Sequence, residues 1–367
     1  MTTTELLQAL IRIPSVNPDG GPGSAETGEK ACAEYLAEFL AEIGAETTLE
    51  DVFPGRPNVV GRFPSDRAGK PKLLFAPHTD TVSVAGMTIE PFSGELRDGK
   101  IWGRGASDTK GPMAAMLSAL SGCREILPHL SHEIWFAGLM SEETDQHGAK
   151  ALAETRRFDF VVVGEPTDLQ IVRTHKGSAR LTLRARGKAV HSSTPDQGSN
   201  AIVLMMDALS DLRAEIARSF AGLHDDVLGA PTSSIGTFHG GSKVNIVPDF
   251  CEAQLDMRTI PGQDVRPMLD AFAAKFPGIE ISARHSDSLR TEAEHPLIKK
   301  LEAGGAQCTG APWFCDAAIF AAKGIPAVAI GPGSIAQAHT ADEWIAVAEL
   351  DRGARFFTEF LKSLSTP

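Results

Sequence analysis

Residues 72–80, KLLFAPHTD, place an apolar run directly before polar residues that can bind a metal. The run is almost continuously apolar, as expected of a strand that helices cover on both faces. The same pattern recurs at residues 133–143 (EIWFAGLMSEE), 160–166 (FVVVGEP) and 325–339 (IPAVAIGPGSIAQAH). Helical patterns accompany these runs: residues 26–43 end at Gly44, and residues 113–121 follow Pro112. Alternating buried strands and helices predict an α/β fold with a largely parallel central sheet.

A different pattern occupies the middle of the chain. Residues 178–186 alternate apolar and polar side chains, which predicts a strand with one face in water. Ser199 is placed to cap a long amphipathic helix that follows it. Further expected elements are a strand near Ile235, a strand at 251–260, a helix at 265–276 and a strand at 279–283. This β-α-β-β-α-β order is typical of a ferredoxin-like α+β domain.

The length of 367 residues exceeds the usual size of one domain, about 100–200 residues. Because residues 325–330 return to the buried-strand style of the first half, we interpret the ferredoxin-like segment as an insertion. The expected division is a catalytic domain formed by residues 1–173 and 287–367, interrupted by an inserted domain at residues 174–286.

Composition excludes several classes of protein. The formal net charge of −12 disfavours a nucleic-acid or anionic-membrane partner, since either requires a basic face. The five cysteines are widely spread and contain no CxxC, which is typical of a reducing compartment. The N-terminal residues lack the features of a signal peptide, and charges interrupt every apolar run. We therefore expect a cytoplasmic protein that does not enter a membrane.

The polar residues after the buried strands form a set of metal ligands. Ligand sites of open α/β sheets lie at the carboxyl ends of the strands, and these segments place His78, Asp108, Glu143, Glu165 and His339 there. Clustered carboxylates are too costly to bury together without a cation. The three carboxylates supply three negative charges, which suits two divalent metal ions.

The spacing also suggests a role for each ligand. If Asp108 bridges, each ion obtains one histidine, one terminal carboxylate and one bridging oxygen, a ligand set suited to zinc with an open catalytic position. Asp80 lies two residues after His78 and can orient its ring. Glu142 is left without a metal beside the ligand Glu143, where a general base is needed.

Each residue also has a purely structural interpretation. His78 can be a buried structural histidine, Asp108 a helix cap, and Glu165 a loop residue. The pair Glu142–Glu143 can begin a solvated helix. These interpretations must all hold at once, at the same ends of successive strands, whereas a metal site explains the residues together.

These motifs resemble those of the co-catalytic zinc metallopeptidases and deacylases, a family that includes acetylornithine deacetylase, succinyl-diaminopimelate desuccinylase, aminoacylase and carboxypeptidase G. The resemblance extends from residues 6–18 (LLQALIRIPSVNP) to residues 339–343 (HTADE). It implies a zinc-peptidase-like catalytic domain with two metal ions, zinc or else cobalt or manganese. By this analogy His78, Asp108 and Glu165 hold one ion, and Asp108, Glu143 and His339 hold the other. Asp80 then supports His78, and Glu142 is the general base.

The resemblance also implies a function for the insertion, as a lid and dimerisation domain of a homodimer. Residues 189–193 (AVHSS) match the motif whose histidine, here His191, assists catalysis. Asn245 and Arg258 match residues that contact substrate. Their structural alternatives are a turn residue for Asn245, and for Arg258 a surface residue paired with Glu252 or Asp256.

The implied substrate is a small N-acyl amino acid, because residues 331–339 (GPGSIAQAH) are similar to the loop of acetylornithine deacetylase. Alternatives are a desuccinylase-like or carboxypeptidase G-like activity and, more remotely, a non-catalytic binding protein on the same fold. Residues 313–318 (WFCDAA) depart from the Gly-Thr/Ser-Asp sequence of many relatives. There Cys315 is expected to be a small buried hydrophobe and Asp316 the cap of a helix. The chain lacks the GxSxG motif of a serine hydrolase, and GRGAS is not the dinucleotide fingerprint GxGxxG.

Overall fold

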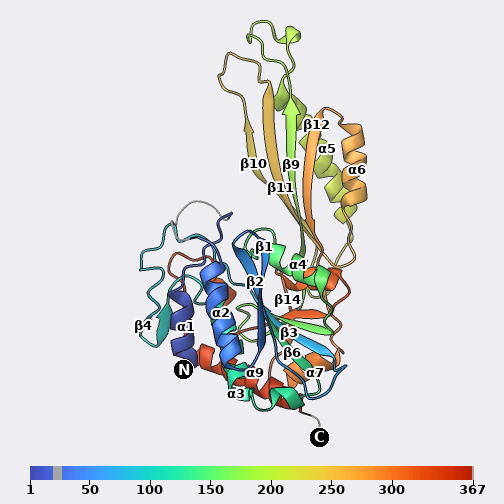
Figure 1. The fold of residues 1–367 in the computed structure, drawn as a ribbon. Coiled ribbons are helices and arrows are strands. Elements are labelled where there is room, and N and C mark those ends of the chain that lie inside the picture. Colours follow the sequence, from blue (N-terminus) through green and yellow to red (C-terminus); the bar gives the residue numbers. More distant parts are fainter. Residues whose placement is uncertain (20–26, 366–367) are drawn as a thin grey trace. The chain divides into compact units, whose positions relative to one another are not determined.

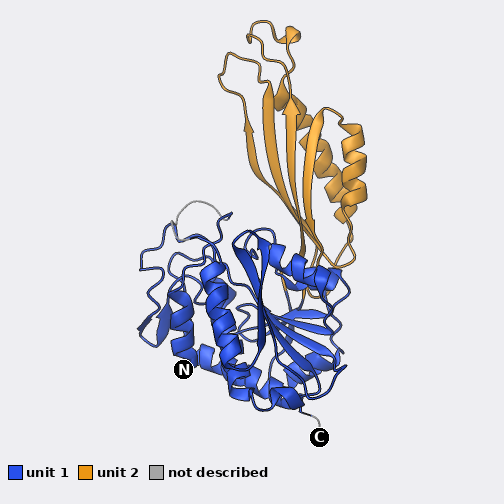
Figure 2. Cartoon of the chain, in the orientation of Figure 1, with its two compact units in different colours: residues 1–173, 290–310, 315–367 blue, residues 174–289, 311–314 orange. Residues whose placement is uncertain are grey.

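The computed structural model describes residues 1–19 and 27–365, which form two compact units (Figure 2). Unit 1 comprises residues 1–173, 290–310 and 315–367, and unit 2 comprises residues 174–289 and 311–314. The range expected for the insertion, 174–286, ends three residues earlier and lacks the short second segment. That segment joins unit 2 through a backbone hydrogen bond from Lys176 N to Ala311 O, at 3.2 Å.

Four parallel strands form the centre of the unit 1 sheet (Figure 1). In spatial order they are β6 (Glu133–Gly138), β3 (Lys72–Pro77), β7 (Phe160–Gly164) and β15 (Ala327–Ala329). Almost every residue of β3 and β7 is buried, so side chains on both faces of the sheet are covered. The predicted α/β fold with a largely parallel central sheet is confirmed.

Antiparallel strands extend this sheet at both edges and make it mixed. The strands β1 and β2 form a hairpin, and β2 pairs antiparallel with β6. On the other side β8 pairs antiparallel with β15. The bounds of these edge strands are β1 Glu46–Phe53, β2 Arg56–Arg62, β8 Ile171–His175, β13 Leu289–Arg290 and β14 Cys308–Ala311. A separate three-stranded sheet contains β4 (Glu95–Arg97), β5 (Lys100–Trp102) and β16 (Trp344–Ala346).

Helices pack on the unit 1 sheet, and α3 is the most buried of them. Its bounds, Lys110–Cys123, begin three residues before the predicted start, because Pro112 lies in the first turn, where its missing N–H costs nothing. The remaining helices of unit 1 are α1 Thr3–Ile11, α2 Lys30–Glu42, α4 His147–Thr155, α7 Pro296–Ala303, α8 Ala317–Ala322 and α9 Val347–Ser363. The expected start of α2, Glu26, lies outside the described residues.

Unit 2 is a four-stranded antiparallel sheet with two helices. Its sheet order is β10-β11-β9-β12, and its chain order is the β-α-β-β-α-β arrangement expected of a ferredoxin-like domain. The bounds are β9 Gly177–Arg186, α5 Ala201–Phe220, β10 Thr232–Gly240, β11 Phe250–Thr259, α6 Arg266–Lys275 and β12 Ile279–Ser286. The inward faces of β9 and β11 and one stripe of α5 form its core.

The predicted cap of α5 is wrong by one residue. Ser199 pairs through its backbone with Lys188, in a short β-bridge. Asn200 caps the helix instead, because its Oδ1 accepts hydrogen bonds from Ile202 N at 3.0 Å and Val203 N at 3.2 Å. Asparagine is among the best capping residues, so the sequence permitted either choice.

Two further observations concern the cysteines and the apolar character of the helices. All five cysteines are free thiols, so no disulfide framework supports the fold. Among residues 1–19 and 27–365, no helix combines the length and apolar character needed to cross a membrane.

Candidate metal centre

The ends of the parallel strands bring together side chains that are far apart in the sequence. His78 directly follows β3, Glu143 comes from the turn after β6, and Glu165 directly follows β7. Asp108 lies just before α3, and His339 lies in the loop after β15. These residues form two groups that share Asp108, and within each group the ligand atoms all lie within 4.8 Å of one another. One group is His78, Asp108 and Glu165, and the other is Asp108, Glu143 and His339.

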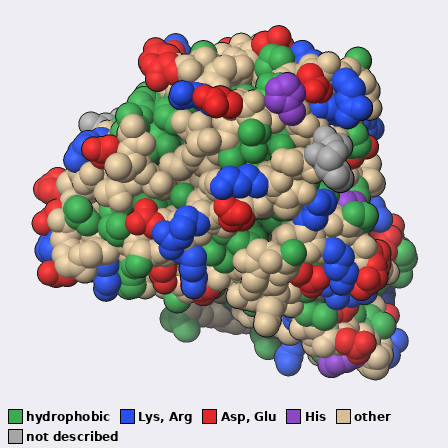
Figure 3. Space-filling model, turned by 90° about the horizontal axis from the view of Figure 1, so that it is seen from below, with side chains coloured by type: hydrophobic (Ala, Val, Ile, Leu, Met, Phe, Trp, Pro, Cys, Tyr) green, Lys and Arg blue, Asp and Glu red, His purple; other side chains and the backbone are tan. Residues whose placement is uncertain are grey.

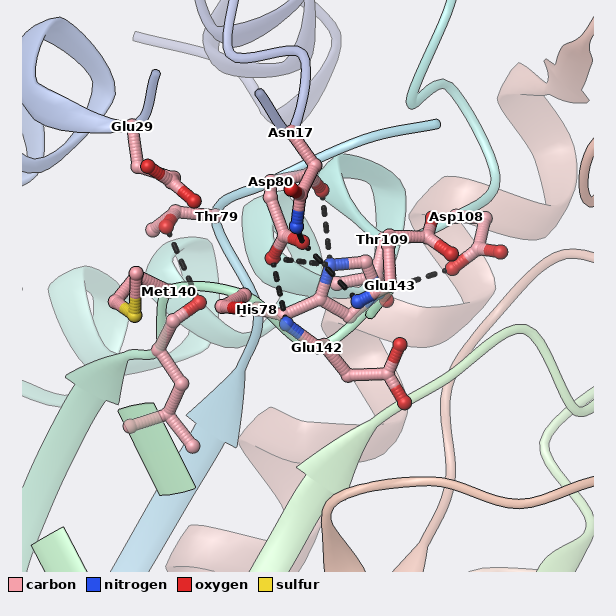
Figure 4. Close-up of polar contacts among 12 residues, drawn as sticks. Asn17, Glu29, His78, Thr79, Asp80, Asp108, Thr109, Met140, Glu142 and Glu143 are labelled. Atoms are coloured by element: carbon pink, nitrogen blue, oxygen red, sulfur yellow. Dashed lines mark hydrogen bonds and ion pairs between the residues drawn. The ribbon is translucent and has the colours of Figure 1, made fainter. Parts of the chain in front are cut away.

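The two oxygens of Asp108 face different histidines. Oδ1 lies 3.1 Å from His78 Nε2, a contact drawn in Figure 4, and Oδ2 lies 3.3 Å from His339 Nε2. His339 Nε2 is also 3.0 Å from Glu143 Oε2. His339 adopts a left-handed backbone with φ of 60°, an uncommon conformation that persists where the surrounding structure imposes it. This arrangement suits a carboxylate that bridges two cations.

Asp80 contacts the turn of Glu142 and Glu143 in addition to His78. The nearest acceptor for His78 Nδ1 is the backbone oxygen of Asp80, at 2.9 Å, while the Asp80 carboxylate is 3.5 Å away. That carboxylate instead accepts the backbone N–H groups of Glu142 at 3.0 Å and Glu143 at 3.1 Å (Figure 4). Asp80 therefore fixes the turn that carries both glutamates as well as orienting His78.

Sequence reasoning missed Asn17, which completes this arrangement. Its side-chain amide donates to Asp80 Oδ2 at 2.8 Å, and both residues are fully buried (Figure 4). The contact joins residues 63 positions apart, so no local spacing could indicate it. A buried hydrogen bond to a charged acceptor contributes about 1.5–3 kcal/mol, enough to hold the carboxylate in one orientation.

The electrostatics show an acidic cluster that needs positive charge. Burial and the neighbouring Asp108 raise the pKa of Glu143 to about 7. Burial and Asp108 likewise raise the pKa of Glu165 well above its ordinary value, and Glu165 Oε1 is buried without a hydrogen-bond partner. Hydrogen bonds to Asp108 and Glu143 raise the pKa of His339 to about 10. Protons thus supply the positive charge here, and a divalent ion can replace them.

The residues present therefore fit two metal ions. Each group offers one imidazole nitrogen and two carboxylates, a donor set suited to zinc, cobalt or manganese. A cation held by the first group would supply the partner that the buried Oε1 of Glu165 does not have. Two of the structural alternatives are wrong: Thr109, not Asp108, is the N-cap of α3, and Glu142 is buried in a turn that precedes α4.

Glu142 lies beside the two groups without belonging to either. Its backbone is held by Asp80, and the residue is 9% exposed. Burial and the charge of Glu165 raise the pKa of Glu142 well above its ordinary value. A carboxyl group with a raised pKa can both accept and return a proton near neutral pH, which is what a general base that later acts as an acid must do.

The expected roles of Cys315 and Asp316 have different outcomes. Cys315 is 1% exposed, as expected of a small buried hydrophobe, and burial raises the pKa of its thiol. Asp316 occupies the predicted N-cap position of α8, but its side chain makes no cap hydrogen bond and its buried Oδ1 has no hydrogen-bond partner. Burial raises the pKa of Asp316 to about 7.

The remaining predicted site residues belong to unit 2 and to neither metal group. The segments that carry His191 and Asn245 are neighbours. Ser192 N donates to Asn245 O at 3.0 Å, and the backbones of His191 and Ile246 form an antiparallel β-bridge. His191 Nδ1 lies 2.8 Å from Ser193 Oγ. Arg258 Nε pairs with Asp256 Oδ1 at 2.8 Å, the ion pair given by its structural alternative.

Comparison with known proteins decides the family. The model of peptidase family M20/M25/M40 matches residues 74–363. The chain belongs to this family. It is a metal-dependent hydrolase that acts on amides, and the resemblance inferred from its motifs is confirmed. Among curated relatives of this M20 hydrolase, acetylornithine deacetylase from Pectobacterium carotovorum is 32% identical, over 93% of this chain and 92% of that protein. The enzyme of the same name from Pectobacterium atrosepticum is 34% identical, over 94% and 93%.

Solved structures share the fold of this M20 hydrolase. An M20 metallo-carboxypeptidase from Sulfolobus solfataricus has a TM-score of 0.80 at 22% identity, covering 99% of both chains. Aminopeptidase PepT from Bacillus cereus has a TM-score of 0.78 at 21% identity, covering 99% of this chain and 98% of that one. A Bacillus subtilis protein described as a dinuclear metal binding peptidase of family M20 has a TM-score of 0.68 at 16% identity, covering 100% of this chain and 98% of that one.

The raised pKa values predict how metal stabilises this M20 hydrolase as pH changes. Without metal, the pKa of Glu143 is about 7 against an ordinary 4.5. The stability gained from its protonated form is therefore complete below the unfolded pKa and lost as pH rises through about 7. Metal ions replace these protons and bind more tightly as pH rises. The difference in Tm between zinc-loaded and chelated protein should therefore widen from pH 6 to pH 8.

Thermal unfolding of both forms across this range measures the effect. Asp66→Asn is a matched control, because Asp66 is a surface carboxylate whose pKa of about 2 lies below the range. It should leave the pH dependence unchanged. A difference in Tm that stays constant or narrows as pH rises would contradict the assignment of the cluster as a cation site.

Proposed function

We propose that the chain removes the acyl group from an N-acyl amino acid at a two-metal site, with N-acetylornithine as the leading substrate. The observation that carries the two-metal part is the sharing of Asp108, whose two oxygens face two separate ligand groups. The substrate part is supported by the relatives named acetylornithine deacetylase, which match over more than nine-tenths of the chain.

The chemistry divides between the ions and the protein. Two divalent ions, one held by His78, Asp108 and Glu165 and the other by Asp108, Glu143 and His339, would polarise the scissile carbonyl and lower the pKa of water. Glu142 would take a proton from the attacking water while the oxygen of that water bonds to the carbonyl carbon. The carbon–nitrogen bond then breaks, and Glu142 returns the proton to the leaving nitrogen. The products are a carboxylic acid and a free amine.

This mechanism predicts a strong effect of replacing Glu142. Glu142→Gln keeps the size of the side chain but removes the group that transfers the proton. It should lower kcat by about two to four orders of magnitude, the usual contribution of a general acid–base residue. Metal content should stay at the wild-type value, because Glu142 is in neither ligand group.

Glu143→Gln is the matched comparison, since it changes the neighbouring residue in the same turn. That variant should lose metal as well as activity. Turnover measured together with metal analysis separates the two roles, and near-normal turnover in Glu142→Gln would show that another group moves the proton.

Substrate recognition by unit 2 is the next proposal. A free α-carboxylate must lose water when it binds, and a planar guanidinium can meet it with two parallel hydrogen bonds. Arg258 suits this task, because Asp256 holds its guanidinium through Nε at 2.8 Å and Nη2 at 3.1 Å and so fixes its plane. We propose that Arg258 and Asn245 bind the substrate and that His191 stabilises the developing oxyanion, as the resemblance of their motifs to those of the family implies.

The role of Arg258 predicts a requirement for the free carboxylate. Converting an N-acetyl amino acid into its amide should abolish most of the kcat/KM of the wild-type enzyme. Arg258→Lys should be nearly as harmful as Arg258→Ala, because an ammonium group cannot reproduce the paired hydrogen bonds. Kinetics of both compounds with each variant provide the measurement. Equal cleavage of the acid and the amide by the wild type would show that the carboxylate is not recognised.

Unit 2 also supports the proposal of a homodimer. Its strand β10 lies at the edge of the sheet, and Ile235 and Phe238 on it are 38% and 40% exposed. Val203 and Met206 on α5 are 50% and 57% exposed. Proteins generally cover exposed apolar edge strands, and pairing of β10 with a second copy would do so. Sedimentation velocity tests this: Phe238→Lys should shift dimer toward monomer, whereas a wild-type monomer would exclude the proposal.

The charge distribution favours a small-molecule partner over nucleic acid. On the face seen in Figure 3, lysine and arginine side chains are interspersed with acidic ones and form no continuous basic area. The five free cysteines support our proposal of a cytoplasmic location, where thiols stay reduced.

A second candidate function is peptide hydrolysis, because the structural neighbours include an aminopeptidase and a carboxypeptidase. A screen with zinc or cobalt would separate the candidates. Its panel contains N-acetylornithine, other N-acetyl amino acids, N-succinyl-diaminopimelate and a glutamate-capped amide. The proposal expects the N-acetyl compounds to be preferred, and preference for the glutamate-capped amide would favour the peptidase.

A further inference from the structure

A buried carboxylate outside both metal groups binds the loop that carries Asp108. Glu343 is 1% exposed and lies four residues after the ligand His339. Its Oε1 accepts hydrogen bonds from Ser107 N at 2.7 Å and Asp108 N at 2.8 Å. Its Oε2 accepts from Gly105 N at 2.9 Å and from Arg104 Nη1 at 3.0 Å. Four donors thus meet a single side chain.

Burying the Glu343 carboxylate at this place costs free energy. A buried carboxylate loses its hydration, and Glu343 lies close enough to Asp108 for the two negative charges to repel. Hydrogen bonds to a charged acceptor are about twice as strong as neutral ones, so four of them can offset this cost. The result is a loop in which the backbone N–H groups of Gly105, Ser107 and Asp108 all donate to one fixed carboxylate.

Arg104 extends the contact to the other loops of the site. Its guanidinium is 3% exposed and donates to Thr340 O at 3.1 Å, next to His339, as well as to Glu343. It also donates to Ser83 O at 2.9 Å, in the loop that follows Asp80. The pair Arg104–Glu343 therefore joins the Asp108 loop to the loop of His339 and to the loop after β3.

We propose that Glu343 is a positioning residue for the two-metal centre, which fixes the shared ligand Asp108 relative to His339. The inference rests on the proposed two-metal function. Because Asp108 belongs to both groups, loosening its loop should weaken both ions. Because His339 belongs only to the group with Glu143, the ion in that group should be weakened more.

Glu343→Gln tests this role with little change in shape. The amide cannot accept hydrogen bonds through its NH2 group, so two of the four donors lose their acceptor. The ion in the group with Glu143 and His339 should lose affinity by about 10- to 100-fold, the usual effect of removing a residue that orients metal ligands. Titration of the metal-free full chain with zinc, in competition with a chromogenic chelator, measures both affinities without reference to activity.

Asp342→Asn is the matched control. Asp342 is the adjacent acidic residue, but its carboxylate accepts from Thr88 N at 2.9 Å and from Ile89 N at 3.3 Å, away from the Asp108 loop. Its two zinc affinities should equal those of the wild type. If Glu343→Gln fails to fold by circular dichroism, Arg104→Lys replaces it, because lysine keeps the buried charge but lacks the planar fork that donates to Glu343, Thr340 and Ser83.

The outcomes separate this inference from the proposed function. Weakened zinc binding in Glu343→Gln, or in Arg104→Lys, with normal binding in Asp342→Asn supports the positioning role. Wild-type affinities in the Glu343 variant, or an equal loss in the Asp342 control, overturn it. A wild-type chain that binds two ions but cleaves no N-acyl amino acid would overturn the proposed substrate and leave the role of Glu343 standing.

Discussion

The repulsion among buried carboxylates is the constraint on which the site depends. Asp108, Glu143 and Glu165 converge where water cannot screen them, and burial raises the pKa of both glutamates. Protons on the two histidines and the glutamates are one solution, and divalent ions are the other. The parallel strands of unit 1 cause this repulsion and also form the site, because their carboxyl ends place the candidate ligands at one edge of the sheet.

Two further carboxylates hold this arrangement without belonging to a ligand group. Asp80 accepts the backbone N–H groups of Glu142 and Glu143, and Glu343 accepts those of the Asp108 loop. In each case a buried charge fixes the backbone of a ligand loop, whose side chains are then free to face the ions. Asn17 and Arg104 in turn hold the two carboxylates. The positions of the ligands thus depend on hydrogen bonds as much as on the strands.

The parts predictable from sequence were those with a local pattern. Buried runs followed by polar residues identified β3, β6, β7 and the candidate ligands after them, which the structure brings together, and alternation identified β9 and β11. Asn17 and Glu343 were missed as supporting residues, because their partners lie 63 and 235 positions away and no spacing records such a contact. The Ser199 cap was wrong because the neighbouring Asn200 is an equally good capping residue, and Asp316 occupies its predicted N-cap position without the expected side-chain hydrogen bond.

Metal content of two variants tests the central claim, that Asp108 is shared by two ions, most directly. Asp108→Ala removes a ligand from both groups, whereas His339→Ala removes a ligand from one. Inductively coupled plasma analysis of zinc-loaded, dialysed protein should find two ions per chain in the wild type, about one in His339→Ala and close to none in Asp108→Ala. Equal loss of a single ion in both variants would contradict a shared carboxylate.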